Sequence, residues 1–243
     1  FLNGDWRLIL RLDKYLSKAI NVSRSDAQAI IKKGIVKVND EIIRKKDFNI
    51  NEDIDQVIYL DQILEYHEFV YFMLNKPQGV VSAVVDNKDK TVVDLIEERK
   101  DIFPVGRLDK DTEGLLILTN NGSLAHKLTS PKSQVVKKYY VEVENKIKSE
   151  DVEAFKSGLY ITDGDNELFL TKPALLEIVT NNSCYVSITE GKFHQVKKMF
   201  HNVNNEVIYL KRVSMGNITL DESLKVGSYR PLTNQEVIML KDI

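Results

Sequence analysis

The sequence predicts an α+β protein in two parts, a small domain of two helices and a β-hairpin and a larger domain with a mostly antiparallel sheet. Of its 243 residues, 43% are apolar, which suits one large or two smaller globular domains. Strand-like segments outnumber helical ones without regular alternation, which favours antiparallel over parallel sheet. The charge along the chain then marks the division into two parts.

The net charge of −2 is an average over unlike segments. Residues 7–46 carry eleven Lys or Arg and four Asp or Glu, whereas residues 47–68 carry seven acids and no Lys or Arg. This break predicts a basic domain at 7–60, a linker at 61–67 and a second domain at 68–243. The near-neutral total argues against a strongly basic nucleic-acid binder, but the first segment does not.

The small domain is predicted to be helix, helix and hairpin. Apolar residues recur at a helical spacing of three and four at Leu12, Tyr15, Leu16, Ala19 and Ile20. Ser23 is placed to cap a second helix, with a buried stripe of Ala27, Ile30 and Ile31. Residues 35–43 then predict two strands joined by a tight turn at Asn39 and Asp40.

The larger domain is predicted to contain seven strands, at 69–74, 80–85, 114–119, 137–144, 174–179, 184–189 and 207–210. Its predicted helices cover 91–100, a segment from Ser123 to before Pro131, 149–158 and 193–202, with a final capping box at Thr233 and Glu236.

Several site classes are disfavoured by composition. The single Cys184 excludes an internal disulfide framework and a cysteine-rich metal site. His194 and His201 could share a helix face but lack a third ligand, and residues 163–167 lack the glycine and glutamate of a calcium loop. We therefore expect no metal and no cofactor. The absence of a long apolar span or a leader predicts a cytoplasmic protein without a membrane partner.

One segment stands out as a candidate for chemistry. Residues 106–115 read Gly-Arg-Leu-Asp-Lys-Asp-Thr-Glu-Gly-Leu and place Asp109 between glycines ahead of a predicted strand. Glycine lets the backbone approach a ligand closely. Spacing alone leaves open whether Asp109 belongs to an Asp-rich turn or faces a substrate.

Two family resemblances bear on this choice. Residues 11–16, 23–25 and 34–40 resemble the S4 RNA-binding domain, which implies structured ribosomal RNA as a partner, although the lysines alone would suit a solvated surface. Residues 106–115 resemble the signature of pseudouridine synthases of the RsuA/RluB group. Residues 137–141 and 190–200 resemble further blocks of that group, so the resemblance covers essentially the whole chain.

The resemblance implies roles for three residues in an isomerisation of uridine that consumes no cofactor. Asp109 matches the nucleophile, and whether it attacks the sugar or the uracil ring stays open. Lys197 matches its basic partner, where many relatives carry Arg. Tyr139 matches the tyrosine that stacks on the base, and its hydroxyl is a candidate proton acceptor. Neighbouring strand residues face opposite sides, so Tyr140 is assigned to core packing.

The same resemblance and the local basic charge imply RNA contacts. Arg107 matches the residue that fills the stack vacated by the flipped base. The other predicted RNA-binding residues are Arg11, Lys14, Arg24, Lys32, Lys33, Lys137, Lys138, His194 and Gln195.

The substrate is expected to be 16S rRNA in assembling small-subunit particles, because residues 71–79, 170–174 and 229–233 look closest to the RsuA branch, and the protein is expected to be a monomer. Three alternatives stay open. The first is a 23S rRNA synthase of the RluB/RluE/RluF branch, and the second is a non-catalytic RNA-binding assembly factor. The third is a glycoside hydrolase that pairs Asp109 with Glu113.

Overall fold

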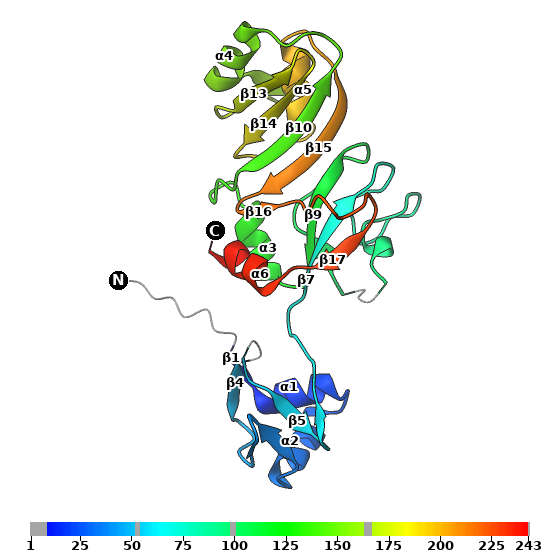
Figure 1. The fold of residues 1–243 in the computed structure, drawn as a ribbon, viewed down its shortest axis with the longest axis vertical. Helices are drawn as coiled ribbons and strands as arrows, with labels where there is room; N and C mark the ends of the chain where they lie inside the picture. The colour runs from blue at the N-terminus through cyan, green and yellow to red at the C-terminus, as the bar shows by residue number, and fades with distance from the viewer. Residues whose placement is uncertain (1–8, 52–53, 98–100, 163–166, 243) are drawn as a thin grey trace, which may run out of the picture. The chain divides into compact units, whose positions relative to one another are not determined.

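A computed structural model describes residues 9–51, 54–97, 101–162 and 167–242. The chain divides into two compact units, residues 1–68 and 69–243 (Figure 1). The predicted α+β class is confirmed, with a small helical and hairpin unit followed by a unit built on a large sheet. Residues 7 and 8 of the predicted small domain lie outside the described part.

The two predicted helices and the hairpin of the small unit are confirmed. Helix α1 covers Leu12–Ala19 and helix α2 covers Arg24–Lys32. Ser23 caps α2, because its Oγ accepts a hydrogen bond from the backbone N–H of Asp26 at 3.1 Å. Strands β2 (Val36–Val38) and β3 (Glu41–Ile42) are joined through two residues with positive φ, Asn39 and Asp40.

The acidic segment is part of the small unit's folded structure. It forms three strands, β4 (Asn49–Asn51), β5 (Val57–Tyr59) and β6 (Gln62–Ile63). β5 joins a four-stranded sheet in the order β3-β2-β5-β6, and β4 pairs with β1 (Ile9–Arg11). The linker predicted over 61–67 therefore contains β6, and the division between the units falls after residue 68.

The large unit is built on a nine-stranded sheet with the main order β13-β14-β10-β15-β9-β7-β17 (Figure 1). Its strands are β7 (Tyr71–Lys76), β8 (Phe103–Pro104), β9 (Glu113–Thr119), β10 (Lys137–Val143), β13 (Leu175–Thr180), β14 (Ser183–Ile188), β15 (Val207–Met215), β16 (Ile218–Thr219) and β17 (Tyr229–Pro231). A short pair, β11 (Tyr160–Thr162) and β12 (Leu168–Leu170), lies outside it.

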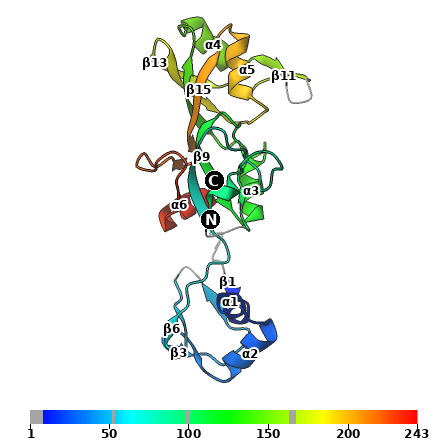
Figure 2. The ribbon, with the colours of Figure 1, turned by 90° about the vertical axis from the view of Figure 1, so that its right-hand side faces the viewer.

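This sheet consists of two antiparallel halves joined by one parallel pair. Among the named strands of the described residues, only β9 and β15 pair in parallel. Helices α4 (Ser149–Ser157) and α5 (Gln195–Asn202) pack on the half that contains β10, and Figure 2 shows α5 beside β15. Helices α3 (Gly122–Thr129) and α6 (Asn234–Lys241) pack in a second core against β7 and β9.

Three local predictions in the large unit are wrong. Residues 80–85 form no strand, and only Val81 makes an isolated bridge, to Thr91. The helix predicted over 91–100 is reduced to a 3₁₀ turn at Val93–Leu95 within its described part, because residues 98–100 lie outside it. Asn121, rather than Ser123, caps α3 by accepting the N–H of Leu124 at 3.1 Å.

Candidate active site

Asp109 lies in the turn that leads into β9, next to the junction between the two halves of the sheet. The backbone N–H of Thr112 donates to the carbonyl of Asp109 at 3.0 Å and closes the turn. Gly114 follows with φ +102°, and a Cβ at this position would lie 2.2 Å from the carbonyl oxygen of Arg212 on β15. The close approach of β9 to β15 therefore requires glycine at 114.

A buried lysine fixes the backbone of this turn from below. Lys76 is fully buried, and its Nζ donates to the carbonyl oxygens of Asp109 at 3.0 Å and Thr112 at 2.9 Å. Burial lowers the pKa of Lys76 to about 8, although the nearby carboxylates of Asp109, Asp111 and Glu113 act in the opposite direction. The carbonyl oxygens of the turn thus accept hydrogen bonds from the Lys76 ammonium group, and the nearby carboxylates balance its positive charge.

Two further contacts hold the same turn against the segment after β7. The hydroxyl of Ser82 donates to the carbonyl of Leu108 at 2.8 Å and accepts its N–H at 3.0 Å. The N–H of Gly79 donates to the carbonyl of Lys110 at 2.8 Å. The position of Asp109 is consequently set by backbone contacts on both sides of it.

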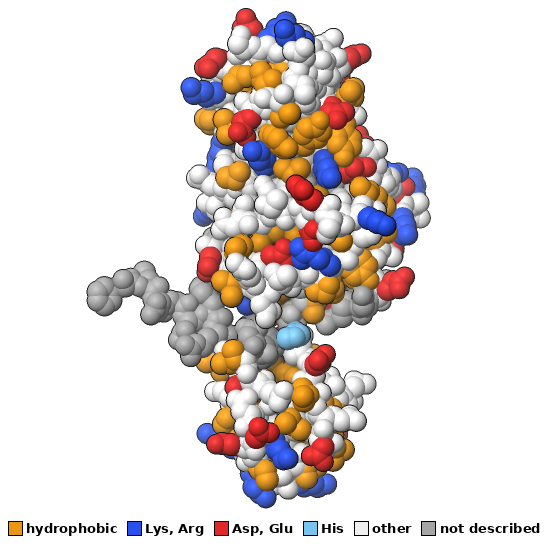
Figure 3. Space-filling view, viewed as in Figure 1, with side chains coloured by type: hydrophobic (Ala, Val, Ile, Leu, Met, Phe, Trp, Pro, Cys, Tyr) orange, Lys and Arg blue, Asp and Glu red, His pale blue; other side chains and the backbone are white. Residues whose placement is uncertain are grey.

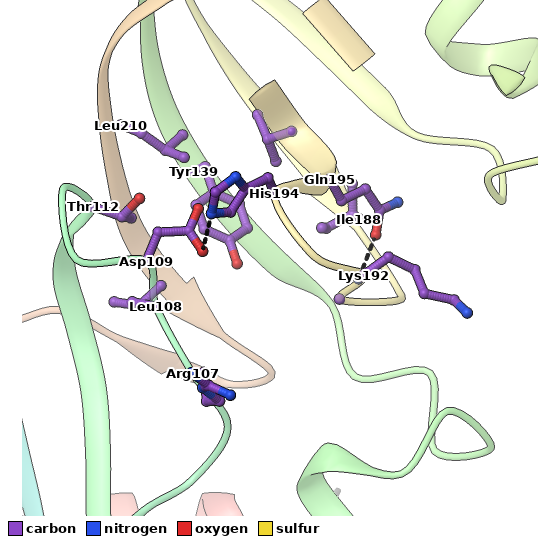
Figure 4. Close-up of a pocket in the computed structure, with 12 residues that line it drawn as sticks. Arg107, Leu108, Asp109, Thr112, Tyr139, Ile188, Lys192, His194, Gln195 and Leu210 are labelled. Atoms are coloured by element: carbon purple, nitrogen blue, oxygen red, sulfur yellow. Dashed lines mark hydrogen bonds and ion pairs between the residues drawn. The ribbon is translucent and has the colours of Figure 1, made fainter. Parts of the chain in front are cut away.

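The carboxylate of Asp109 faces the N-terminal end of α5. Its side chain is 26% exposed, with His194 Nε2 at 3.6 Å from Oδ1 and Lys197 Nζ at 3.6 Å from Oδ2. Figure 4 shows the carboxylate pointing toward the His194 ring, with the Tyr139 ring behind it. Neither side chain is within hydrogen-bonding distance of the carboxylate, so both carboxylate oxygens keep their lone pairs available.

Lys197 is shared between two carboxylates. Its Nζ lies 2.5 Å from Oδ1 of Asp111, which is closer than its approach to Asp109. Burial raises the pKa of Asp111, but the hydrogen bond and positive charge of Lys197 outweigh it, so the pKa is lowered overall. Asp111 is 69% exposed at the mouth of the site.

A small pocket of about 60 Å³ opens beside the Asp109 carboxylate. Its lining includes Arg107, Asp109, Thr112, Tyr139, His194 and Gln195. The structure therefore brings together three segments far apart in the sequence, the turn before β9, the first residues of β10 and the start of α5. Lys197 joins them through its approach to Asp109.

Tyr139 and Tyr140 point to opposite faces of β10, as expected. Tyr139 is 7% exposed and lines the pocket, where it also packs in the core. Tyr140 is half-buried in an aromatic cluster with Tyr185 and Tyr209. The assignment of Tyr140 rather than Tyr139 to the core is therefore wrong, because the helices cover the face on which Tyr139 lies.

Glu113 is directed away from the pocket. Its carboxylate accepts a hydrogen bond from the hydroxyl of Tyr209 at 2.7 Å, in the aromatic cluster on the other face of the sheet. Burial and this carboxylate raise the pKa of Tyr209. A glycosidase arrangement would need the two carboxylates on either side of a sugar, and this pair does not provide it.

The remaining residues predicted to bind RNA in the large unit differ in exposure. Arg107 is exposed at the pocket edge, whereas Gln195 is buried and its amide bonds Glu190 at 2.8 Å and the N–H of Lys192 at 3.0 Å. Lys137 is half-buried and donates to the carbonyl of Val135. Lys138 lies on the other face, paired with Glu177. Arg107 is thus the best placed of these for a ligand.

In the small unit, the predicted basic side chains include a pair held by a buried acid. Asp13 is fully buried and accepts hydrogen bonds from Arg11, Arg24 and Gln28 at distances between 2.7 and 3.3 Å. Burial raises its pKa, but these hydrogen bonds outweigh it and lower the pKa to about 2. Both guanidinium groups stay about half exposed.

The other three residues predicted to bind RNA in the small unit are lysines. Lys32 and Lys33 are exposed at the end of α2, and Lys14 forms an ion pair with Glu68. On the face of the large unit in view, Figure 3 shows basic and acidic side chains interspersed.

Within the described residues, no group of three or more His, Cys, Asp and Glu is placed to hold a metal ion. His194 and His201 point to different partners, Asp109 and Glu206. Residues 163–166 of the calcium-like segment lie outside the described part. Among the helices that the structure describes, none is long and apolar enough to cross a membrane.

Three residues of this region were not found by sequence reasoning. They are Lys76, Asp111 in its contact with Lys197, and Arg212, a buried arginine whose Nε donates to the carbonyl of Leu115. Asp111 lies inside the recognised segment 106–115 and could have been proposed from it. Lys76 and Arg212 lie in β7 and β15, just beyond the ends of the predicted strands 69–74 and 207–210, where no motif indicates their role.

Comparisons with known proteins identify the families to which two segments of the chain are similar. Residues 70–202 match the family model described as RNA pseudouridylate synthase, and residues 10–53 match the S4 domain. The chain is 45% identical over 240 residues to the Bacillus subtilis (strain 168) protein named "Uncharacterized RNA pseudouridine synthase YtzG", covering 96% of this chain and 99% of that protein.

It is also 39% identical over 230 residues to "Ribosomal small subunit pseudouridine synthase A" of Escherichia coli (strain K12), covering 94% of this chain and 98% of that protein. A solved structure titled "Crystal structure of pseudouridylate synthase" matches with a TM-score of 0.66 and 37% identity, covering 95% of this chain and 99% of that one.

Proposed function

This chain belongs to the RNA pseudouridylate synthase family and carries an S4 domain, and from that premise we propose that it converts one uridine of 16S ribosomal RNA to pseudouridine, with Asp109 as the nucleophile. The observation that carries the proposal is the position of the Asp109 carboxylate. It lines the same pocket as Tyr139, and its Oδ2 lies 3.6 Å from Lys197 Nζ. The small-subunit target is supported by the 39% identical relative from Escherichia coli, which is named as a ribosomal small subunit pseudouridine synthase.

The reaction is a balanced isomerisation of one nucleotide. The N1–C1′ bond of uridine breaks, the uracil turns while bound, and a C5–C1′ bond forms. The proton on C5 is then lost to a base and N1 gains one, so the product has the composition of the substrate. Such a reaction needs a nucleophile, an electrostatic partner and a surface that holds the loose base.

Lys197 supplies a positive charge beside the nucleophile. Two opposite unit charges about 4 Å apart attract by about 4 kcal/mol at the effective dielectric of a protein surface. The attraction stabilises the charged carboxylate without a short hydrogen bond to either oxygen. Asp109 can then form a bond to the sugar or to the uracil ring, and both routes are compatible with its place in the pocket.

Tyr139 and Arg107 would handle the base. A uridine inside folded RNA must leave its stack before Asp109 can reach it, at a cost of about a few kcal/mol. Tyr139 lines the pocket and can stack on the extruded uracil, with its hydroxyl as candidate proton acceptor. Arg107 is exposed at the pocket edge and can enter the vacated position in the RNA.

Tritium release from [5-³H]uridine-labelled rRNA tests the proposal, since the C5 proton is lost only if pseudouridine forms. We expect release from 16S rRNA in small-subunit particles and none from 23S rRNA. Asp109→Asn should reduce the single-turnover rate by at least about 1,000-fold, as the loss of a nucleophile does in other enzymes.

Each failure has its own meaning. Release from 23S rRNA alone would reject the small-subunit target, and full release by Asp109→Asn would reject the nucleophile. Free uracil in place of pseudouridine would indicate a hydrolase. Tight RNA binding without any release would indicate an RNA-binding factor.

A further inference from the structure

His194 has an unusual backbone for its place in the fold. It precedes α5 with φ +54° and ψ +31°, in the left-handed region that few residues other than glycine occupy. Such a conformation costs about 1–3 kcal/mol and persists only where the surroundings enforce it. Here the next residue, Gln195, is buried and its amide is bonded to Glu190 and Lys192.

The ring of His194 is held by a stack rather than by burial. Its neighbour Phe193 lies against it with ring centroids 3.8 Å apart and planes 19° apart. Lys198 Nζ lies 4.9 Å from the centre of the Phe193 ring. Phe193 is itself 56% exposed, so the core does not account for its position. The stack and the left-handed backbone together direct the imidazole at the pocket.

The imidazole faces the oxygen of Asp109 that Lys197 does not. Nε2 of His194 lies 3.6 Å from Oδ1, while Lys197 Nζ lies 3.6 Å from Oδ2 and is also bound by Asp111. Among the described residues, Asp109 is the one ion-pair partner recorded for the His194 side chain. Catalytic hydrogen bonds are often long before substrate binds and tighten in the complex.

We propose that His194 is a positioning residue for the nucleophile, and that its Nε2–H closes on Oδ1 of Asp109 when RNA fills the pocket. With Oδ1 held, the lone pairs of Oδ2 are aimed at the reacting base or sugar. Phe193 contributes by fixing the plane of the imidazole. The inference rests on the proposed function of Asp109 and assigns His194 a role in chemistry rather than in RNA affinity.

Two substitutions separate the donor atom from the backbone effect. In His194→Gln the amide nitrogen occupies about the place of Nε2, so it can still donate to Oδ1. In His194→Asn the amide nitrogen occupies about the place of Nδ1 and cannot reach Oδ1, yet Asn tolerates a left-handed backbone. We expect His194→Asn to slow the single-turnover rate roughly 10- to 100-fold, as small misplacements of reacting groups do, and His194→Gln to retain most of the rate.

Phe193 offers an independent variant pair. Phe193→Leu removes the ring against which the imidazole stacks, whereas Phe193→Tyr keeps it. We expect the Leu variant to lose rate and the Tyr variant to keep it. Tyr160→Leu is the matched control, because Tyr160 is 61% exposed and bonds through its carbonyl to Asn202 at the opposite end of α5.

RNA affinity decides between positioning and contact with RNA. In an Asp109→Asn background, adding His194→Asn should leave the Kd for 16S particles unchanged within about two-fold. A wild-type rate in His194→Asn, or a weakened Kd that accounts for its slower rate, would overturn the inference. Failure of the wild-type protein to form pseudouridine in either rRNA would instead overturn the proposed function.

Discussion

Each unit of the protein contains one aspartate placed between two basic side chains, and the two aspartates are held in opposite ways. Asp13 in the small unit is fully buried and accepts five hydrogen bonds, from Arg11, Arg24 and Gln28. Asp109 in the large unit is 26% exposed, and its two basic neighbours stay 3.6 Å away.

The difference separates a carboxylate that organises other groups from one that can react. Both carboxylate oxygens of Asp13 accept hydrogen bonds, and the charged group orients two guanidinium groups toward solvent. Asp109 has two basic side chains nearby but no short hydrogen bond to its carboxylate oxygens among the described residues. What is fixed at Asp109 is the backbone, through Lys76 and Ser82, and not the side chain.

The largest predicted effect comes from removing the backbone support. Lys76→Met keeps an unbranched apolar side chain but removes the ammonium group, which leaves the carbonyls of Asp109 and Thr112 without their donor. We expect a loss of about 3 kcal/mol in unfolding free energy, because buried acceptors of a charged donor become unsatisfied. The single-turnover rate should fall by about 100-fold, since Asp109 moves with the turn.

Denaturant unfolding and tritium release measure the two effects. Lys127→Met is the control, because Lys127 Nζ also donates to a backbone carbonyl, that of Lys241, but lies outside the turn. If Lys76→Met folded and reacted like the wild-type protein, Ser82 and Gly79 would be sufficient to hold the turn.

The next effect tests whether the hydrogen bonds to the Asp13 carboxylate stabilise its charged form in the folded protein. Although burial raises its pKa, the hydrogen bonds from Arg24, Gln28 and Arg11 lower it to about 2, below the usual 3.8 of an aspartate, so folding favours the charged form. The contribution is complete above pH 3.8 and is lost as the pH falls toward 2. The difference corresponds to about 2 kcal/mol.

Hydrogen exchange of the α1 and α2 amides, compared between wild type and Asp13→Asn at each pH, reports this local stability. The protection lost in the variant should shrink between pH 4 and pH 2. A difference independent of pH would mean that the Asp13 carboxylate is not the group that titrates.

A smaller effect is expected from Asp111, which draws Lys197 away from the nucleophile. In Asp111→Asn the lysine loses its 2.5 Å partner and can close on Asp109, which would make Asp109 resemble Asp13. We expect a roughly 10-fold lower single-turnover rate, because a tightly paired carboxylate is a poorer nucleophile, which corresponds to about 1.4 kcal/mol.

Asp89→Asn is the matched control, since Asp89 pairs with Lys110 of the same turn but contacts neither Lys197 nor Asp109 in any ion pair of the described residues. A faster Asp111→Asn variant would show that Lys197 activates Asp109 best at short distance.

Local signals in the sequence predicted much of the fold. The caps at Ser23 and at Thr233 with Glu236 are confirmed, because a cap depends on residues three positions apart. The prediction of a strand at 80–85 is wrong, because an apolar run does not show that Val84 and Val85 are exposed. The strands within residues 49–63 are not predicted, because the acids of residues 47–68 indicate a break in charge between two domains and give no strand pattern.

The site was predictable where its residues share a short motif and not where they meet only in space. Asp109, Tyr139 and Lys197 come from three blocks that carry the family resemblance. The structure places Asp109 and Tyr139 at one pocket, with Lys197 Nζ 3.6 Å from the Asp109 carboxylate. Lys76 is 33 positions from Asp109, and its role appears only when its Nζ is seen to reach that carbonyl. The stack on His194 likewise depends on a left-handed backbone that no sequence pattern indicates.

The smallest predicted effect tests whether the arginines paired with Asp13 contact the RNA backbone. Arg24 is 52% exposed, and its hydrogen bonds to Asp13, at 3.2 and 3.3 Å, are on average longer than those of Arg11, at 2.9 and 3.2 Å. It can therefore exchange part of its pairing for a phosphate of the RNA. Arg24→Gln should weaken RNA binding about 3-fold and lower the slope of log K against log salt by about one, the value for one lost phosphate contact.

Lys37→Gln is the matched control for Arg24→Gln, since Lys37 is 42% exposed in the same unit and lies on β2, where its buried neighbours Val36 and Val38 face the helices. If both variants lost the same affinity and slope, the small unit would act through its total charge alone. A loss confined to Arg24→Gln would place the RNA on the helical face of the small unit. There the buried Asp13 carboxylate orients the Arg24 guanidinium group toward solvent, where it can bind a phosphate.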